Sequence, residues 1–226
     1  MNQNKIILDL CGGTGSWSKP YKDNGYEVFN LTLPDYDVTR PQQLPPEVLE
    51  AISSGSVYGI LAAPPCTMFS DARTNAKTPR DLVGGWKVVE ACLYIIRQCM
   101  LKTTSDQQKY SPLKFWALEN PWYGRLKWFL GNPPFVFSPW EFGDNYKKKT
   151  AIWGYFNEPV KTFTKAEQVM SEEEIKKCAT ISRTLPKFDY MKSADIHPEY
   201  YKKFDRQTRR SITPQGFALA FFDKNR

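Results

Sequence analysis

The chain has 226 residues, and its hydrophobic content of 41% is enough for one α/β domain with a sizeable core. The single histidine, His197, nearly excludes a reaction that needs histidine as its base. Five cysteines without C-x-x-C spacing argue against a disulfide framework and against a metal site. The sequence has no long apolar run, which predicts a cytoplasmic protein without a membrane segment, and the net charge of +7 suits a polyanionic partner.

The apolar patterns predict strands separated by helices, in chain order. Strands are expected at residues 5–10, 26–33, 58–62 and 114–120, with further candidates at 135–137 and 150–156. Helices are expected at residues 17–24, 84–102 and 215–223, and a short capped helix is expected at 171–177, with Ser171 as its N-cap. The helix at 84–102 has an apolar face formed by Val88, Ala91, Cys92, Ile95, Ile96 and Cys99.

A glycine-rich segment, Cys11-Gly12-Gly13-Thr14-Gly15, follows the first predicted strand. Glycines at this place let backbone N–H groups approach a ligand at the start of a helix. The spacing is not G-x-G-x-x-G and no P-loop lysine follows, so phosphate binding is not indicated. The alternative is a plain glycine turn.

Acidic residues follow the second predicted strand. Asp35 and Asp37 lie where α/β proteins often hold ribose hydroxyls, and Asp37 could also meet an adenine amino group. Asp is common in turns, so solvated loop carboxylates are the alternative interpretation.

The segment around Cys66 has the composition of a nucleophile turn. Pro64 and Pro65 end the strand at 58–62, because proline cannot donate to a sheet, and they stiffen the turn that follows. Cys66 comes next, with hydroxyl groups at Thr67 and Ser70. The alternative is that Cys66 packs as a small apolar residue.

Glu119 and Asn120 end the strand predicted at 114–120. The carboxyl ends of strands form the edge where α/β folds place their ligands. Residues 12–15 and Cys66 follow other strands, so three strand ends are expected to converge on one crevice. Basic runs at 147–149 and 206–210 are either solvated surface or contacts for phosphate.

The ordered set DLCGGTG, DYDV, APPCTMFS, ALENP, KKKTAIWG and RSITPQGFALAFF resembles the cytosine-C5 DNA methyltransferase family, in its small phage-like form. The resemblance covers the ends and the middle of the chain. It implies a Rossmann-like α/β fold of S-adenosylmethionine-dependent methyltransferases, with a mostly parallel sheet and helices on both faces. It also implies a catalytic core at 1–156, a reduced target-recognition region at 157–205, and a C-terminal motif and helix at 206–226 that pack on the core.

The resemblance also implies roles for single residues. Cys66 would add to carbon 6 of cytosine, Glu119 would bond ring nitrogen 3 and the amino group, and Lys148 would meet the base carbonyl. S-adenosylmethionine contacts are implied for Asp9, Cys11, Gly12, Gly13, Thr14, Gly15, Trp17, Asp35, Asp37, Pro64 and Ser211. Substrate contacts are implied for Pro65, Ser70, Asn120, Lys147, Lys149, Thr150, Arg209 and Arg210.

The chain departs from the family pattern in its cofactor and recognition motifs. Cys11 replaces the aromatic residue that stacks on adenine, for which Trp17 could compensate, and Ser211 replaces an asparagine. The recognition region has about fifty residues, short of a typical domain, so a protein partner could supply specificity. The implied partner is DNA, as a duplex with a flipped cytosine or as a single strand, in a bacterial or phage-infected cell.

Two alternatives stay open beside this interpretation. The same chemistry could act on RNA or on a free cytidine nucleotide, which the short recognition region permits. The chain could instead be a non-catalytic regulator that binds cofactor and DNA. Cys66 and Glu119 argue against the regulator, because it would need neither.

Overall fold

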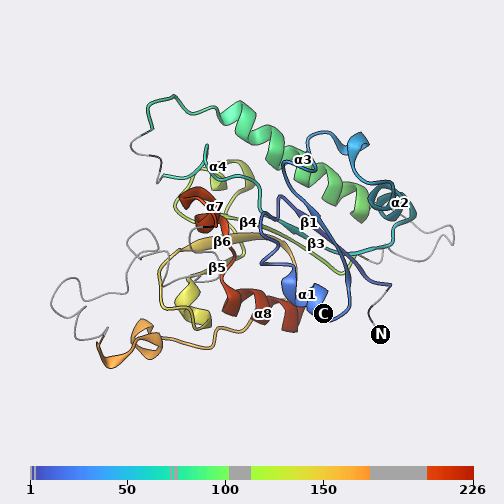
Figure 1. Cartoon of the computed structure of the whole chain (residues 1–226). Helices are drawn as coiled ribbons and strands as arrows, with labels where there is room; N and C mark the ends of the chain where they lie inside the picture. The colour runs from blue at the N-terminus through green and yellow to red at the C-terminus, as the bar shows by residue number, and fades with distance from the viewer. Residues whose placement is uncertain (1, 3, 72, 74–75, 102–112, 174–202) are drawn as a thin grey trace.

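The computed structural model describes residues 2, 4–71, 73, 76–101, 113–173 and 203–226. These residues form an α/β fold in which a six-stranded sheet lies between helices (Figure 1). The strands are β1 (Ile6–Leu10), β2 (Glu27–Leu31), β3 (Val57–Ala62), β4 (Phe115–Pro121), β5 (Phe135–Phe137) and β6 (Thr150–Tyr155). The helices are α1 (Lys19–Asp23), α2 (Pro46–Ser54), α3 (Leu82–Met100), α4 (Lys127–Leu130), α7 (Arg206–Ser211) and α8 (Gln215–Lys224), with 3-10 turns η1 (Pro41–Gln43), η2 (Pro139–Phe142) and η3 (Ala166–Val169).

The sheet is mixed, with the strand order β2-β1-β3-β4-β6-β5. The neighbouring strands β2, β1, β3 and β4 pair in parallel, whereas β6 runs antiparallel to both β4 and β5. The predicted α/β class is confirmed, and the parallel arrangement holds for four of the six strands, β1 to β4. The segment that joins β4 to β6 contains β5 and the four-residue α4 but no long crossover helix, and β6 returns antiparallel to β4.

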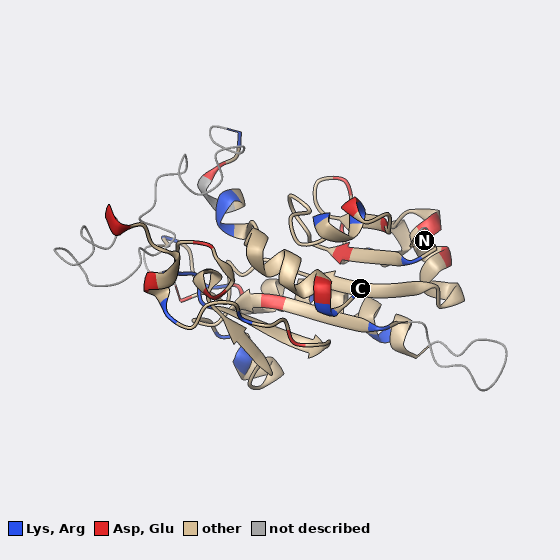
Figure 2. Cartoon of the chain, turned by 90° about the horizontal axis from the view of Figure 1, so that it is seen from below, with Lys and Arg blue, Asp and Glu red and all other residues tan. Residues whose placement is uncertain are grey.

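Side chains alternate between the two faces of the sheet, as successive residues of a strand must. In β1, Leu8 packs in one core cluster with α2 and α3, while Ile7 packs in the other with α1 and α8. In β3, Ile60 packs in the cluster with α2 and α3, and Leu61 packs in the cluster with α1 and α8. The strands are therefore apolar on both faces, and Figure 2 shows few charged residues along them.

The helix α3 forms much of the cover on one face, and the expected apolar helix at 84–102 is confirmed with bounds two residues earlier. Its first turn is capped by Asp81, whose side chain accepts a hydrogen bond from the Gly84 N–H at 2.8 Å. The fully buried residues of this helix are Val89, Cys92, Ile95, Ile96 and Cys99. Val88 and Ala91, expected on this face, lie at its margin and are only partly buried.

Besides the four-residue helix α4, two longer helices were not expected from the sequence. One is α2, which starts with Pro46 at its first position and ends at Gly55 in the left-handed conformation, φ 73°. These two residues are a start and stop signal that was available in the sequence. The other is α7, whose N-cap Asp205 accepts a hydrogen bond from the Thr208 N–H at 2.7 Å.

The C-terminal helix α8 covers the other face of the sheet together with α1 (Figure 1). Phe217 stacks on Phe137 with ring centroids 3.9 Å apart, and Phe221 packs against Phe115. The division at 157–205 stays a prediction, because most of that region, including part of a helix expected after Ser171, lies outside the described residues. No helix within the described ranges has the length and apolar character needed to cross a membrane.

Candidate active site

Three of the sequence motifs follow neighbouring parallel strands. Leu10 at the end of β1 is in register with Ala62 of β3, and Ala62 is in register with Leu118 of β4. The carboxyl ends of these strands, which lie side by side in Figure 1, therefore form one edge of the sheet. The glycine segment and the Cys66 turn continue from this edge, and Glu119 lies near the end of β4. This edge is where open α/β sheets bind their ligands.

The glycine segment turns sharply through left-handed backbone conformations. Cys11, Gly13 and Gly15 have φ values of 58°, 56° and 70°, which a glycine adopts without strain. The turn is held from β2 and the residues after it, because Asn30 Nδ2 donates to the Gly13 carbonyl at 3.0 Å and the Gly13 N–H donates to Thr32 Oγ1 at 3.3 Å. Sequence reasoning missed Asn30 and Thr32, although polar residues at alternate positions of a strand end are a signal for such contacts.

Asp9 and Gly12 form the base of this turn. A Cβ placed on Gly12 would lie 2.3 Å from the Asp9 carboxyl carbon, so only glycine fits there. Asp9 is fully buried and accepts a hydrogen bond from Ser18 Oγ at 2.5 Å. Burial raises the pKa of the Asp9 carboxyl to about 6, against the effect of the Ser18 hydrogen bond. The structure thus gives Asp9 a supporting position beneath the loop, not one open to a ligand.

Cys66 begins a tight turn after β3. Its carbonyl accepts hydrogen bonds from the N–H groups of Phe69 and Ser70 at 2.9 and 2.8 Å. Pro64, just before it, is buried, and its carbonyl accepts a hydrogen bond from Asn120 Nδ2 at 3.0 Å. Asn120 therefore ties the end of β4 to the turn that carries Cys66. Pro65, which lies between Pro64 and Cys66 in the chain, is exposed.

The Cys66 thiol lies within electrostatic reach of three charged residues. Burial and the charge of Glu119 raise the pKa of the thiol, whereas Lys148 and Arg210 lower it. Burial also raises the pKa of the Glu119 carboxyl, and Lys148 lowers it. A thiol, a carboxyl group that burial biases toward its protonated form, and two cations therefore share one site.

The C-terminal segment at residues 211–212 lies near both Lys148 and the glycine turn. Lys148 Nζ donates to the carbonyl of Ile212 at 3.4 Å, just after α7. The neighbouring Ser211 Oγ is the atom that a Cβ placed on Gly13 would meet, at 3.8 Å. Thr150, which is buried, donates from Oγ1 to the Lys148 carbonyl at 2.8 Å and so fixes the backbone of that lysine.

The other predicted basic residues, Lys147, Lys149 and Arg209, are neighbours of Lys148 and Arg210 in the chain. Lys147 and Arg209 are partly buried, and Arg209 precedes Arg210 on α7. Lys149 is exposed, and its ammonium lies 5.1 Å from the centre of the Trp122 ring. The Lys149 carbonyl also accepts the Trp122 N–H at 3.0 Å, which places the basic run directly beside the end of β4.

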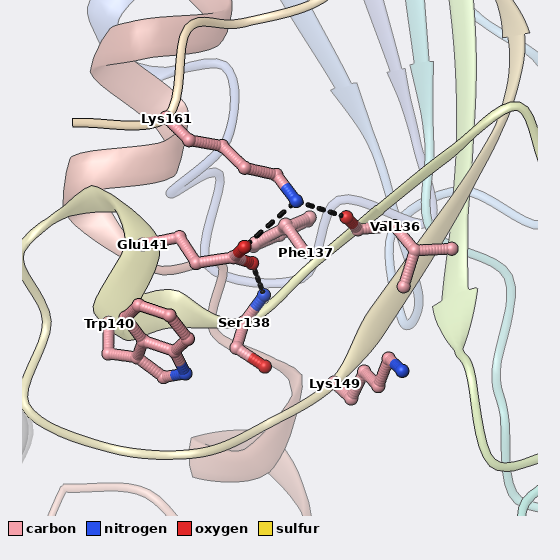
Figure 3. A pocket seen from close by; sticks show the side chains of 7 residues that line it. All are labelled: Val136, Phe137, Ser138, Trp140, Glu141, Lys149 and Lys161. Carbon is pink, nitrogen blue, oxygen red and sulfur yellow. Dashed lines mark hydrogen bonds and ion pairs between the residues drawn. The ribbon is translucent and has the colours of Figure 1, made fainter. Parts of the chain in front are cut away.

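A pocket of about 370 Å³ lies beside β5 and η2 (Figure 3). Its lining residues are Val136, Phe137, Ser138, Trp140, Glu141, Lys149 and Lys161. Glu141 binds Lys161 at 2.9 Å and accepts the Ser138 N–H at 2.5 Å, so its charge is already compensated. Lys149 is the only predicted site residue among this lining, and neither Cys66 nor Glu119 belongs to it.

Trp17 and Cys11, both predicted to contact a cofactor, pack against apolar residues of the protein instead. Trp17 is 2% exposed and packs against Phe217 and Phe221 in the core. It therefore cannot replace the aromatic residue missing at Cys11, and this expectation is corrected. Cys11 itself packs on the core cluster beside α3, where it contacts the thiol of Cys92.

The acidic residues after β2 differ from each other in their contacts. Asp37 Oδ1 accepts hydrogen bonds from the N–H and hydroxyl of Thr39 at 2.9 and 2.7 Å, and these bonds lower the pKa of the Asp37 carboxyl. Arg40 lies 3.6 Å from the other oxygen of Asp37. Asp35 is exposed. Asp37 thus stabilises its own turn, and Asp35 is the carboxylate that faces solvent.

The arrangement can support addition of a thiolate to an electrophilic ring carbon, because a nucleophile, a proton-holding carboxyl group and cations occur together at a ligand-binding edge. The hydroxyl groups of Thr14 and Ser16, which lie 2.5 Å apart, complete the adjacent glycine turn. No protein-family model matches the chain, and no curated protein sequence matches it.

Proposed function

We propose that this chain is a DNA cytosine-C5 methyltransferase that uses S-adenosylmethionine and has the Rossmann-like fold of such enzymes. The observation that carries the proposal is the electrostatic coupling of Cys66 with Glu119 and Lys148 at the carboxyl edge of the sheet. These are the residue types that addition to a cytosine ring requires. The parallel strands β1 to β4, with helices on both faces, support the proposed fold.

The residues at the glycine turn fit S-adenosylmethionine. The space over Gly13 is open, since a Cβ there would meet only Ser211 Oγ at 3.8 Å, and a ligand can approach the backbone closely. Asp35 would reach a ribose hydroxyl, and Ser211 would contact the ligand from the C-terminal side. When bound, S-adenosylmethionine supplies the methyl group that carbon 5 of the cytosine accepts.

Cys66 and Glu119 would act together on the cytosine ring. The Cys66 thiol gives its proton to water, and the thiolate forms a bond to carbon 6 while the electron pair of the carbon 5–carbon 6 double bond moves to carbon 5 and into the ring. Burial raises the pKa of the Glu119 carboxyl group, and in its protonated form this group would donate a hydrogen bond to ring nitrogen 3 and stabilise the charge that develops. After methylation, loss of the carbon 5 proton to water re-forms the double bond and expels the thiolate.

The cations beside Cys66 oppose the rise in the pKa of its thiol that burial causes. Lys148 and Arg210 lower the pKa of the thiol, and this raises the fraction of thiolate available for attack. Lys148 is fixed by its bond to the Ile212 carbonyl, so its charge is held in place before a substrate arrives. Such preorganisation is what makes a charge effective in a partly buried site.

The proposal is tested with DNA that contains 5-fluorocytosine. Fluorine cannot leave carbon 5 as a cation, so the enzyme, incubated with S-adenosylmethionine, should stay bound through Cys66 and show a mass shift on that peptide. Cys66→Ser should form no adduct, since a hydroxyl is a far weaker nucleophile than a thiolate. Glu119→Gln should slow adduct formation by about 10²–10³-fold, as the loss of one charge-stabilising group does.

Cys99→Ala is the matched control, because Cys99 is buried on α3 and should have no part in the chemistry. Its adduct should form at the rate of the unmodified protein. An adduct that forms equally well in Cys66→Ser would show that Cys66 is not the nucleophile. Absence of an adduct with single-stranded and duplex DNA alike would refute the proposed reaction.

A further inference from the structure

The segment that leaves β4 exposes several large aromatic side chains beside basic ones. Tyr123 and Trp128 are 63% and 69% exposed; Tyr123 follows the end of β4, and Trp128 lies on α4. We name as the aromatic–basic surface the residues Trp122, Tyr123, Lys127, Trp128 and Lys149. A group of exposed aromatic rings edged by charged side chains is a feature of binding surfaces, whereas a single exposed ring is not.

Cations and rings are interleaved on the aromatic–basic surface. The ammonium of Lys127 lies 4.8 Å and that of Lys149 lies 5.1 Å from the centre of the Trp122 ring. Lys149 is also 6.0 Å from the centre of the Tyr123 ring. The surface thus offers flat apolar faces and positive charge together, which are the two features that bases and phosphates need.

The aromatic–basic surface is attached directly to the turn that carries Cys66. The Asp71 N–H donates to the Tyr123 carbonyl at 3.1 Å, and the Arg125 N–H donates to the Phe69 carbonyl at 2.9 Å. Ser70, the last residue of the Cys66 turn, forms a bridge with Gly124. These backbone bonds hold the segment that follows β4, from which Tyr123 projects and α4 continues, against the turn that begins at Cys66.

We propose that the aromatic–basic surface binds unpaired nucleotides on either side of the target cytosine, so that the preferred substrate is single-stranded DNA. Tyr123 and Trp128 would stack on bases, and Lys127 and Lys149 would contact backbone phosphates. The inference rests on the proposed function for its choice of DNA and for the target base. The ring faces require bases that are not stacked in a duplex, and this favours a single strand over duplex DNA.

Binding of fluorescein-labelled oligothymidylate, followed by fluorescence anisotropy, tests this surface without cytosine or cofactor. Tyr123→Ala and Trp128→Ala should each weaken binding by about fivefold to a hundredfold, the effect of losing one stacked base. Tyr155→Ala is the matched control, because Tyr155 is a tyrosine of β6 that is 72% exposed and lies at the far end of its pairing with β4. Tyr123→Phe, which keeps the ring, should bind nearly as well as the unmodified protein.

The outcomes separate this inference from the proposed function. Equal affinities of Tyr123→Ala, Trp128→Ala and Tyr155→Ala would overturn it, as would equal or tighter binding of a thymine–adenine duplex. Tighter binding of oligouridylate would assign the surface to RNA, and a self-association lost in Trp128→Ala would assign it to a second copy; either overturns the proposal. Tyr123→Ala and Trp128→Ala could lose oligothymidylate binding while Tyr155→Ala keeps it, even if the unmodified protein forms no adduct with 5-fluorocytosine DNA. That combination would uphold the aromatic–basic surface and refute only the proposed reaction.

Discussion

At the scale of single residues, charges of opposite sign set the reactivity of Cys66. Its pKa is raised by burial and by Glu119, and it is lowered by Lys148 and Arg210. Glu119 therefore has a double effect, since it would stabilise the substrate ring but disfavours the thiolate that attacks it. A protonated Glu119, which its own burial favours, removes that conflict.

This balance predicts opposite shifts in the pH dependence of Cys66 alkylation by iodoacetamide, which reacts with the thiolate. Lys148→Gln removes a positive charge that lowers the pKa of Cys66, so the rate profile should move to higher pH. Glu119→Gln removes a negative charge that raises the pKa, so the profile should move to lower pH. The measurement is the modified fraction of the Cys66 peptide, determined by mass spectrometry between pH 6 and pH 10.

Lys147→Gln is the control for these variants, because Lys147 is the neighbouring lysine and does not contribute to the pKa of Cys66. Its profile should match that of the unmodified protein. Shifts of the same sign in Lys148→Gln and Glu119→Gln would show that changes of packing, not charge, govern this thiol.

At the scale of elements, the candidate site depends on links between strand ends. The buried Asn120 on β4 holds the carbonyl of Pro64, which belongs to the turn after β3. Asn30 on β2 holds the carbonyl of Gly13 in the same way. Side-chain amides thus replace the sheet hydrogen bonds that cease where the strands separate.

The Asn120 link predicts a measurable loss of stability. Asn120→Ala leaves the Pro64 carbonyl buried without its partner, which should lower the free energy of unfolding by about 1–3 kcal/mol in urea titrations. Because the turn is then less well held, the adduct of Cys66 with 5-fluorocytosine DNA should also form more slowly.

Asn24→Ala is the matched control, since Asn24 Nδ2 also donates to a proline carbonyl, that of Pro20, at 2.8 Å. Asn24 is exposed at the end of α1, so water can replace its bond and the loss should be smaller. Equal losses in the two variants would mean that the Asn120 bond does not hold the Cys66 turn.

At the scale of the whole molecule, the proposed cofactor site is formed by both ends of the chain. The glycine turn follows the first strand, and Ser211 beside Gly13 belongs to α7, immediately before the last helix. The helix α8 is anchored by Phe217 and Phe221, which are fully buried, so this end of the chain is held against the sheet. A ligand at the site should therefore stabilise the folded chain as a whole.

S-adenosylhomocysteine should raise the melting temperature by mass action, with about 2.7 kcal/mol of added stability at a hundredfold excess over the dissociation constant. Gly13→Ala and Gly25→Ala both place a side chain at positive φ, 56° and 79°, and should be destabilised alike. Only Gly13→Ala should lose the increase caused by the ligand, because Gly25 lies away from the proposed site. A melting temperature unchanged by millimolar S-adenosylhomocysteine in the unmodified chain would exclude an adenosyl site.

The local sequence was sufficient to predict most of the sheet and the candidate nucleophile. Apolar runs that are followed by Gly or Pro place β1, β3 and β4, because proline cannot donate a hydrogen bond to a neighbouring strand and glycine favours turns. The residue types at Cys66 and Glu119 indicate their chemistry without knowledge of the fold. The short helix α2 was missed because its buried stripe consists only of Val48 and Ala51.

Only the tertiary structure decided which of the predicted residues meet and which do not. Trp17 and Cys11 are both candidates for cofactor contact in the sequence, but Trp17 packs in the core against α8, and Cys11 packs, partly buried, against the core cluster that contains α3. The role of Asn120 depends on a carbonyl 56 residues away in the chain. The exposure of Tyr123 and Trp128 likewise follows from how β4 leaves the sheet, because the sequence near a residue does not determine whether distant segments will cover it.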